Sequence, residues 1–193
     1  DEYGIAKANI ERGLRPPLTG SFNNYFSECM GCPIRSEIWA VVAAGMPDTA
    51  AYYAMIDGIV DHAGESVYSE IFFAVLESVA FEESDILALI RKALAYVPES
   101  SEMRQAVEET VAAWQAHVPL AELRETLVKK YDRGNFTHCV LNIAFTIAGV
   151  LYSEGDFLKS IIYSVNLGYD TDCTGATAGA IIGILDGGDA VIR

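Results

Sequence analysis

The chain has 193 residues, of which 51% are hydrophobic, and a formal net charge of −14. This length and apolar share suffice for one domain with a sizeable core, whereas the acidic balance argues against a nucleic-acid-binding surface, which requires basic patches. No basic flank precedes an apolar run at the beginning of the sequence, and the apolar runs at 143–152 and 176–185 are too short to span a bilayer, so we expect a soluble cytoplasmic protein without a membrane partner.

The spacing of apolar residues predicts helices along most of the chain. Residues 1–13 are expected to be extended or a short helix, Pro16 and Pro17 make 14–20 non-helical, and 21–31 is typical of a loop. The predicted helices then span 33–44 and 47–61, begin at about Ser66, at Ser84-Asp85 and at Ser101-Glu102, and continue with 119–131, 137–151, 157–167 and 174–185. No strand-like alternation competes and no linker divides the chain, so we predict an all-α fold in one compact multi-helical domain over residues 1–193.

The residues with the clearest chemistry lie just before the last predicted helix. Gly168-Tyr169-Asp170-Thr171-Asp172-Cys173-Thr174-Gly175 places two carboxylates one residue apart. Such a turn can aim both at a hard divalent cation such as Mg²⁺, which prefers oxygen ligands in fixed geometry. The alternative is that Asp172 or Thr174 only caps the helix. A cap accounts for one of these residues but not for the Asp-x-Asp pair.

The helix after this turn carries a regular row of glycines. Gly175, Gly179 and Gly183 recur every four residues and therefore lie on one helical face. Because glycine destabilises a helix interior, three in register predict that another helix packs closely against this face.

The Asp-x-Asp segment resembles the C-terminal signature of the ADP-ribosylglycohydrolase family, in which two aspartates bind a pair of Mg²⁺ ions, or Mn²⁺ in some members. The resemblance implies that Asp170 and Asp172 are metal ligands in a site for two ions. The residue after the second aspartate usually adds a hydroxyl ligand in that family. Cys173 stands there instead, and a thiol is a poor ligand for Mg²⁺. Thr174 lies one residue too far along to replace it.

Two further stretches are similar to the family. Residues 30–39, which include Gly31 and Cys32, resemble its glycine-rich loop, whose backbone amides lie against ADP-ribose. Residues 61–68, which begin with Asp61 and His62, resemble a stretch that lines the same cleft. The resemblance therefore implies substrate binding by Gly31, Cys32, Asp61 and His62. For Arg35 we expect an internal ion pair rather than a contact with a diphosphate.

The resemblance implies an orthogonal helical bundle and metal-assisted hydrolysis of the glycosidic bond of an ADP-ribosyl conjugate. The substrate would be ADP-ribose linked to a protein side chain, a nucleic-acid base or a small molecule. The family's Thr-Asp-Asp segment, which supplies the other metal ligands, is not found in this sequence. We therefore expect residues 1–193 to be an N-terminally incomplete domain that is inactive alone, with the general base in the missing segment and no catalytic residue assigned here.

Two other functions stay open. One is a catalytically inactive ADP-ribose-binding or crystallin-like structural protein on the same fold, which Cys173 and the missing acidic segment support. The other is a hydrolase of a different N-glycoside, which would need the same metals.

The cysteines offer a further alternative. Cys29 and Cys32 form a C-x-x-C pair, which occurs in redox sites and in zinc sites. A structural zinc site needs a second pair, but Cys139 and Cys173 are isolated, and the βαβ setting of a redox pair is missing. We expect all four cysteines to be reduced and without a shared function.

Overall fold

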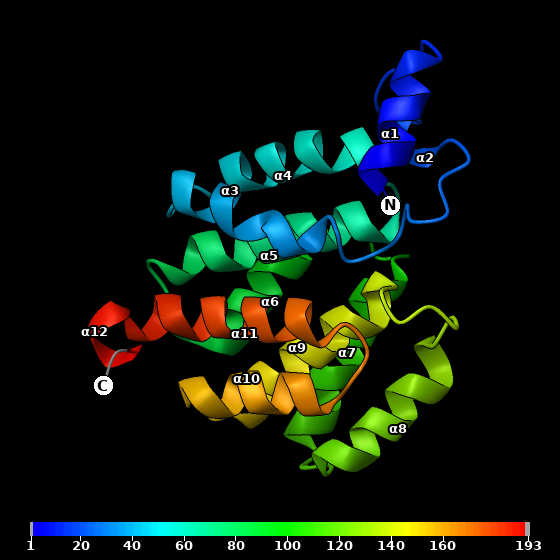
Figure 1. The fold of residues 1–193 in the computed structure, drawn as a ribbon. Coiled ribbons are helices and arrows are strands. Elements are labelled where there is room, and N and C mark those ends of the chain that lie inside the picture. The colour runs from blue at the N-terminus through cyan, green and yellow to red at the C-terminus, as the bar shows by residue number, and fades with distance from the viewer. Residues whose placement is uncertain (1, 192–193) are drawn as a thin grey trace.

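Residues 2–191, which the computed structural model describes, form α-helices joined by turns and contain no strand (Figure 1). Within these residues, Cys29 and His138 form an isolated antiparallel β-bridge. The predicted all-α fold is confirmed. In chain order the helices are α1 (Glu2–Glu11), α2 (Leu18–Ser21), the 3₁₀ turn η1 (Pro33–Arg35), α3 (Ser36–Val42), α4 (Pro47–Asp61), α5 (Glu65–Ala80), α6 (Ile86–Leu94), α7 (Glu102–Gln115), α8 (Leu120–Tyr131), α9 (Cys139–Tyr152), α10 (Phe157–Asn166), α11 (Thr171–Asp186) and α12 (Gly188–Val191).

Two helices, α5 and α9, form the centre of the molecule. Their residues are buried almost all round. The sequence of α9 is apolar along nearly its whole length, as such burial requires, whereas α5 also buries polar and acidic side chains, among them Glu70 and Glu77. Helix α5 packs against α3, α4 and α6, while α9 packs against α7, α10 and α11. Helix α11 lies between α3 and α10 in Figure 1. The turn at its N-terminus contacts the beginning of α9 through a hydrogen bond between Asp170 and Asn142. No helix in the described range is both long and apolar enough to cross a membrane.

The glycine row of α11 allows the close helix packing that the sequence predicts. A Cβ atom on Gly175 would lie 2.9 Å from Val165 of α10, and one on Gly179 would lie 3.2 Å from Ile161. Both distances are shorter than ordinary van der Waals contact. Helices α10 and α11 could therefore not approach this closely with larger residues at these positions.

Helix starts agree with the sequence where a cap residue determines them. The carboxylate of Asp85 accepts a hydrogen bond from the backbone of Leu87 (2.9 Å), and the hydroxyl of Ser101 accepts one from Arg104 (3.2 Å).

The prediction that 14–20 is non-helical is wrong at its end, because α2 begins at Leu18. Pro17 lies just before the first turn of α2. Proline is tolerated there because the backbone N–H groups at a helix start make no intrahelical hydrogen bond, so nothing is lost by its missing N–H. Three other helix starts also differ: residues 33–35 form a 3₁₀ turn before α3, α9 begins two residues later than predicted, and α11 begins three residues earlier.

Candidate functional site

The Asp-x-Asp segment borders a cavity of about 260 Å³ where distant parts of the chain meet. The cavity is lined by Glu2, Phe26, Cys29, Gly31, Thr137, Asp170, Asp172 and Cys173. The structure thus brings Gly31 together with the three candidate metal ligands. Cys32, Asp61 and His62 are not among the lining residues.

The turn before α11 aims the two aspartates. Gly168 and Tyr169 both have left-handed backbone, with φ of 85° and 66°. Glycine adopts this conformation freely, whereas it costs energy for tyrosine. The side chain of Asn142 on α9 holds the turn, because its Oδ1 accepts a hydrogen bond from the backbone N–H of Asp170 (3.1 Å).

The structure does not support the alternative that Asp172 or Thr174 only caps α11. The residue before the first turn is Asp170, and its side chain makes no capping hydrogen bond. Asp172 is exposed in the first turn, and Thr174 is buried with its hydroxyl directed to the backbone of Thr171 (3.4 Å). The carboxylates therefore remain available to a ligand in the cavity.

The ligand atoms of Asp170, Asp172 and Cys173 all lie within 4.8 Å of one another. Burial raises the pKa of Asp170 to about 6, and the neighbouring Asp172 carboxylate contributes to the increase. The described residues that line the cavity include no Lys or Arg to offset these charges. A divalent cation would relieve this repulsion, so the two carboxylates fit a hard metal ion.

The thiol of Cys173 fits Mg²⁺ less well. Burial raises the pKa of Cys173 well above its ordinary value, and the charge of Asp170 raises it further. A protonated thiol is a weak donor to a hard cation.

The Gly31 loop is held beside the beginning of α9. The backbone N–H of Met30 donates to the carbonyl of Thr137, and that of Cys139 donates to the carbonyl of Glu28, both at 2.9 Å. A Cβ atom on Gly31 would collide with the carboxylate of Glu2 and would lie 3.2 Å from Nε2 of His62. Glycine at position 31 therefore permits the loop to pass between these two side chains.

A charged network lies behind the loop. Arg35 pairs with Asp57 (Nε to Oδ2, 2.6 Å) and with Asp61 (Nη2 to Oδ1, 2.7 Å), which confirms the predicted internal ion pair. Asp61 also contacts Nδ1 of the fully buried His62 at 2.9 Å. Although burial alone would raise it, the hydrogen bonds from His62 and Arg35 lower the pKa of Asp61.

The ionised Asp61 fixes the orientation of His62. Because a carboxylate only accepts hydrogen bonds, Nδ1 of His62 carries a proton and donates a hydrogen bond to Asp61. Nε2 of His62 is buried without a hydrogen-bond partner in the described structure and lies next to the Gly31 loop. Asp61 and His62 thus support the loop from behind.

Cys32 belongs to a second buried contact. Its thiol donates to Oε2 of Glu70 (2.6 Å), whose Oε1 accepts a hydrogen bond from the indole of Trp39 (3.0 Å). Burial raises the pKa of Glu70 to about 9. Glu70 is therefore protonated at neutral pH.

We expect Glu70→Gln to stabilise the protein against unfolding at pH 8 and to have little effect at pH 4. Because the folded-state pKa is raised, the stabilising contribution is fully present below the unfolded pKa, 4.5, and is lost as pH rises towards about 9. Over this window one proton changes the unfolding free energy by about 1.4 kcal/mol per pH unit. Glutamine does not ionise; its Oε1 still accepts from Trp39, and its Nε2 donates to the sulfur of Cys32, which accepts in place of donating. Urea unfolding at several pH values tests this, and parallel pH profiles for the two proteins would contradict it.

All four cysteines are free and buried. Among residues 2–191, the side chains grouped closely enough to hold a metal ion together are those of Asp170, Asp172 and Cys173. This group includes neither Cys29 nor Cys32. The structure thus offers no support for a zinc site at the C-x-x-C pair.

Sequence reasoning missed several cavity residues: Glu2, Phe26, Cys29 and Thr137. Cys29 lies two residues before Gly31 and could have been found by extending the loop motif. Glu2 and Thr137 carry no local signal, because α1 and the start of α9 bring them here through tertiary packing.

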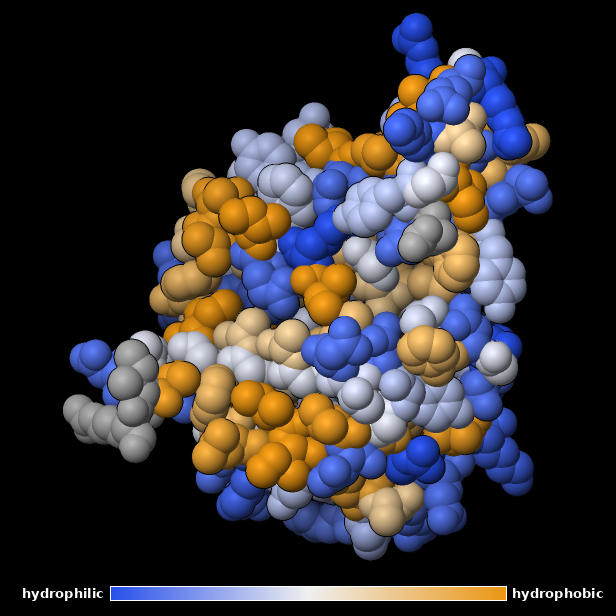
Figure 2. Space-filling view, in the orientation of Figure 1, coloured by the Kyte–Doolittle hydropathy of each residue, from blue (hydrophilic) through white to orange (hydrophobic). Residues whose placement is uncertain are grey.

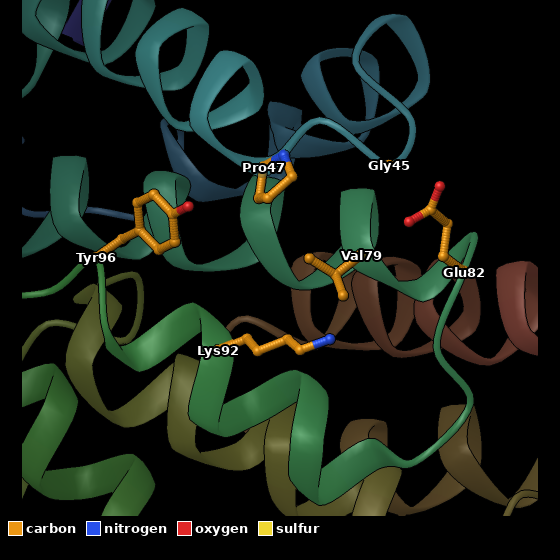
Figure 3. Close-up of a pocket in the computed structure, with 6 residues that line it drawn as sticks. All are labelled: Gly45, Pro47, Val79, Glu82, Lys92 and Tyr96. Atoms are coloured by element: carbon orange, nitrogen blue, oxygen red, sulfur yellow. The ribbon is translucent and has the colours of Figure 1, made fainter.

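A separate hollow of about 340 Å³ contains none of the motif residues (Figure 3). It lies between α5, α6 and the turn before α4 and is lined by Gly45, Pro47, Val79, Glu82, Lys92 and Tyr96. The hydroxyl of Tyr96 donates to Asp48 (2.6 Å), which joins the turn after α6 to the first turn of α4. This hollow therefore marks a packing junction between helices.

The sequence profile of the ADP-ribosylglycohydrolase family matches residues 4–193, nearly the whole chain. No curated protein and no solved structure gives a significant match.

Proposed function

The chain belongs to the ADP-ribosylglycohydrolase family, and from this premise we propose that it is a metal-dependent hydrolase that cleaves the glycosidic bond of an ADP-ribosyl conjugate. The observation that carries the proposal is the cavity shared by Asp170, Asp172 and the Gly31 loop. It combines crowded carboxylates with a loop whose backbone can approach a ligand closely.

We assign metal binding to Asp170 and Asp172, with Mg²⁺ or Mn²⁺ as the cation and two ions in the complete site. When bound, such ions orient sugar hydroxyls and lower the pKa of an attacking water. Asn142 keeps Asp170 in place through the backbone of the turn. No Thr-Asp-Asp segment occurs in residues 1–193, and we assign no further metal ligand and no general base among them.

We assign substrate binding to the Gly31 loop and its supports. Gly31 lets the loop lie flat against a ligand, since a side chain at this position would already meet Glu2 and His62. Arg35 donates to the carbonyl of Gly31 (3.0 Å) and thereby links the loop to Asp61. Cys32, Asp61 and His62 would then act on the substrate by holding the loop rather than through the cavity lining.

Release of ADP-ribose tests this proposal. The complete gene product is incubated with an ADP-ribosylated peptide, first with Mg²⁺ or Mn²⁺ and then with EDTA. We expect release that stops on chelation and returns when the cation is restored. If the protein binds ADP-ribose but releases none under any of these conditions, it is an inactive binding module. If it binds neither ADP-ribose nor divalent cations, the whole proposal is wrong.

The inactive binding module is the second candidate, and Cys173 is the observation that favours it. The thiol occupies the position of a hydroxyl ligand, and its raised pKa keeps it protonated. A site that holds its cation weakly would bind ADP-ribose without efficient hydrolysis.

We expect Cys173→Thr to strengthen Mg²⁺ binding by roughly tenfold, the lower end of the effects seen for changes around a metal site. A threonine hydroxyl supplies the oxygen that Mg²⁺ prefers and is close in size to the thiol. Isothermal titration calorimetry measures this, with Cys29→Ser as the matched control, because Cys29 also lines the cavity but lies outside the ligand cluster. Unimproved Mg²⁺ affinity together with a lower melting temperature would show that position 173 only contributes to packing.

A further inference from the structure

A wide apolar groove runs along α11 on the face seen in Figure 2. We define the apolar groove by Val41, Phe81, Phe157, Gly179, Gly183 and Ile184, and its volume is about 640 Å³. Figure 2 shows apolar side chains gathered over α3 and over α10, with the paler small residues of α11 between them. The groove thus has two raised rims and a low floor.

The rims are strongly exposed. Val41 and Phe81, which line the groove, are 58% and 48% exposed. The same two flanking helices carry further exposed apolar residues, Ile38 and Val42 on α3 (53% each) and Leu158 and Ile162 on α10 (65% and 51%). Scattered apolar residues on a surface need no explanation, but a contiguous patch of this kind marks an interaction site.

Two acidic side chains lie at the α3 side of the groove. Glu37 is the only charged residue among the described residues that line it, and its Oε1 accepts a hydrogen bond from Thr177 of α11 (3.1 Å). Behind it, Glu77 of α5 is fully buried, and its Oε2 accepts only a long hydrogen bond from Ser36 (3.4 Å). Its Oε1 is buried without any hydrogen-bond partner in the described structure.

No basic side chain in residues 2–191 forms an ion pair with Glu37 or Glu77. Burial raises the pKa of Glu37, and burial together with the charge of Glu37 raises that of Glu77. A buried carboxyl oxygen without a partner is costly, and native proteins leave few of them. Glu37 is therefore an acidic side chain at the groove that has no basic partner among the described residues.

We propose that the apolar groove binds a helical segment of a partner protein that presents an apolar face with one Arg or Lys, whose cation pairs with Glu37. One docking event then answers both observations. The apolar face covers the rims and floor, and the cation pairs with Glu37. The small residues Gly179, Ala180 and Gly183 of α11 line the floor between α3 and α10, an arrangement that suits a helix docked in a groove.

A second copy of the chain is a poorer occupant. Each copy carries a formal net charge of −14, so two copies repel one another. A twofold contact is self-complementary, but the described residues that line the groove include no Lys or Arg to offer Glu37. The inference does not depend on the proposed hydrolase activity, since neither the probe nor the readout involves the cavity at Asp170.

The test uses fluorescein-labelled, helix-constrained peptides of about four turns. One carries a leucine-rich face with a single Arg in it, and its match carries citrulline, which is uncharged and nearly isosteric, at that position. Fluorescence anisotropy measures binding to the full chain. We expect the Arg peptide to bind at least about tenfold more tightly than the citrulline peptide.

Three variants define the surface. Glu37→Gln should remove the difference between the two peptides and retain the weaker binding, because glutamine still accepts the hydrogen bond from Thr177. Val41→Glu should abolish binding of both peptides without unfolding, since this side chain is exposed. The matched control is Ile10→Glu on α1, where an equally exposed apolar residue lies outside the groove, and it should change nothing.

Absence of binding, equal binding of the two peptides, or binding that survives Val41→Glu would each overturn the proposal. A dimer in sedimentation analysis that Val41→Glu dissociates would also overturn it, because a second copy would then be the occupant.

Discussion

Replacing either aspartate of the turn, as Asp170→Asn or Asp172→Asn, is expected to abolish divalent-cation binding and to lower hydrolysis by roughly a hundredfold or more. Asparagine keeps the size of the side chain but removes the negative charge that holds a cation. The fold should survive, because Asp172 is exposed and the side chain of Asp170 makes no capping bond.

Although Asp170→Asn should abolish metal binding, it should stabilise the protein in the absence of metal. The raised pKa of Asp170 means that its contribution to stability is present below the unfolded pKa, 3.8, and is lost as pH rises towards about 6. At pH 7 the ionised Asp170 therefore destabilises the metal-free protein. We expect Asp170→Asn to raise the melting temperature in EDTA and to remove the stabilisation that Mg²⁺ gives the wild type.

Calorimetric titration with Mg²⁺ and Mn²⁺ and thermal melts with and without metal measure both effects. Asp186→Asn is the matched control, because Asp186 is an exposed acid at the other end of α11. Unchanged metal affinity in both turn variants would show that the aspartates have no part in cation binding.

A helix start can be predicted from the sequence when the residues that determine it are close to it in the chain. The starts of α6 and α7 could be predicted, because Asp85 and Ser101 cap them with bonds to residues two and three positions away. The start of α11 was placed too late. Its turn is held by Asn142, 28 residues earlier in the chain, and no helical periodicity reveals such a contact.

The site follows the same rule. Asp170, Asp172 and Cys173 are contiguous, so their grouping could be predicted from the motif. The motif also identified Asp61 and His62 but not their place behind the Gly31 loop. Their position depends on Arg35, which lies 26 residues before Asp61 and joins the two segments.

Loss of Arg35 should accordingly destabilise the fold strongly. In Arg35→Met the carboxylate of Asp61, whose side chain is 1% exposed, loses its ion pair. Removing one partner of a buried pair typically costs about 3–5 kcal/mol, because the other charge stays buried. Arg133→Met is the matched control: its partner Glu102 is exposed, and such surface pairs contribute about 1 kcal/mol or less.

Two measurements distinguish loss of the ion pair from loss of packing by the arginine stem. In the wild type the lowered pKa of Asp61 stabilises the fold above the unfolded pKa, 3.8, and this contribution is lost as pH falls below that value. In Arg35→Met the pKa of Asp61 should instead rise, so the deficit in unfolding free energy should be larger at pH 7 than at pH 4. Secondly, Asp61→Asn added to Arg35→Met should recover part of the loss, since the unpaired charge is then removed. A deficit that is independent of pH, with strictly additive losses in the double variant, would mean that Arg35 acts through packing alone and that the Gly31 loop does not depend on the ion pair.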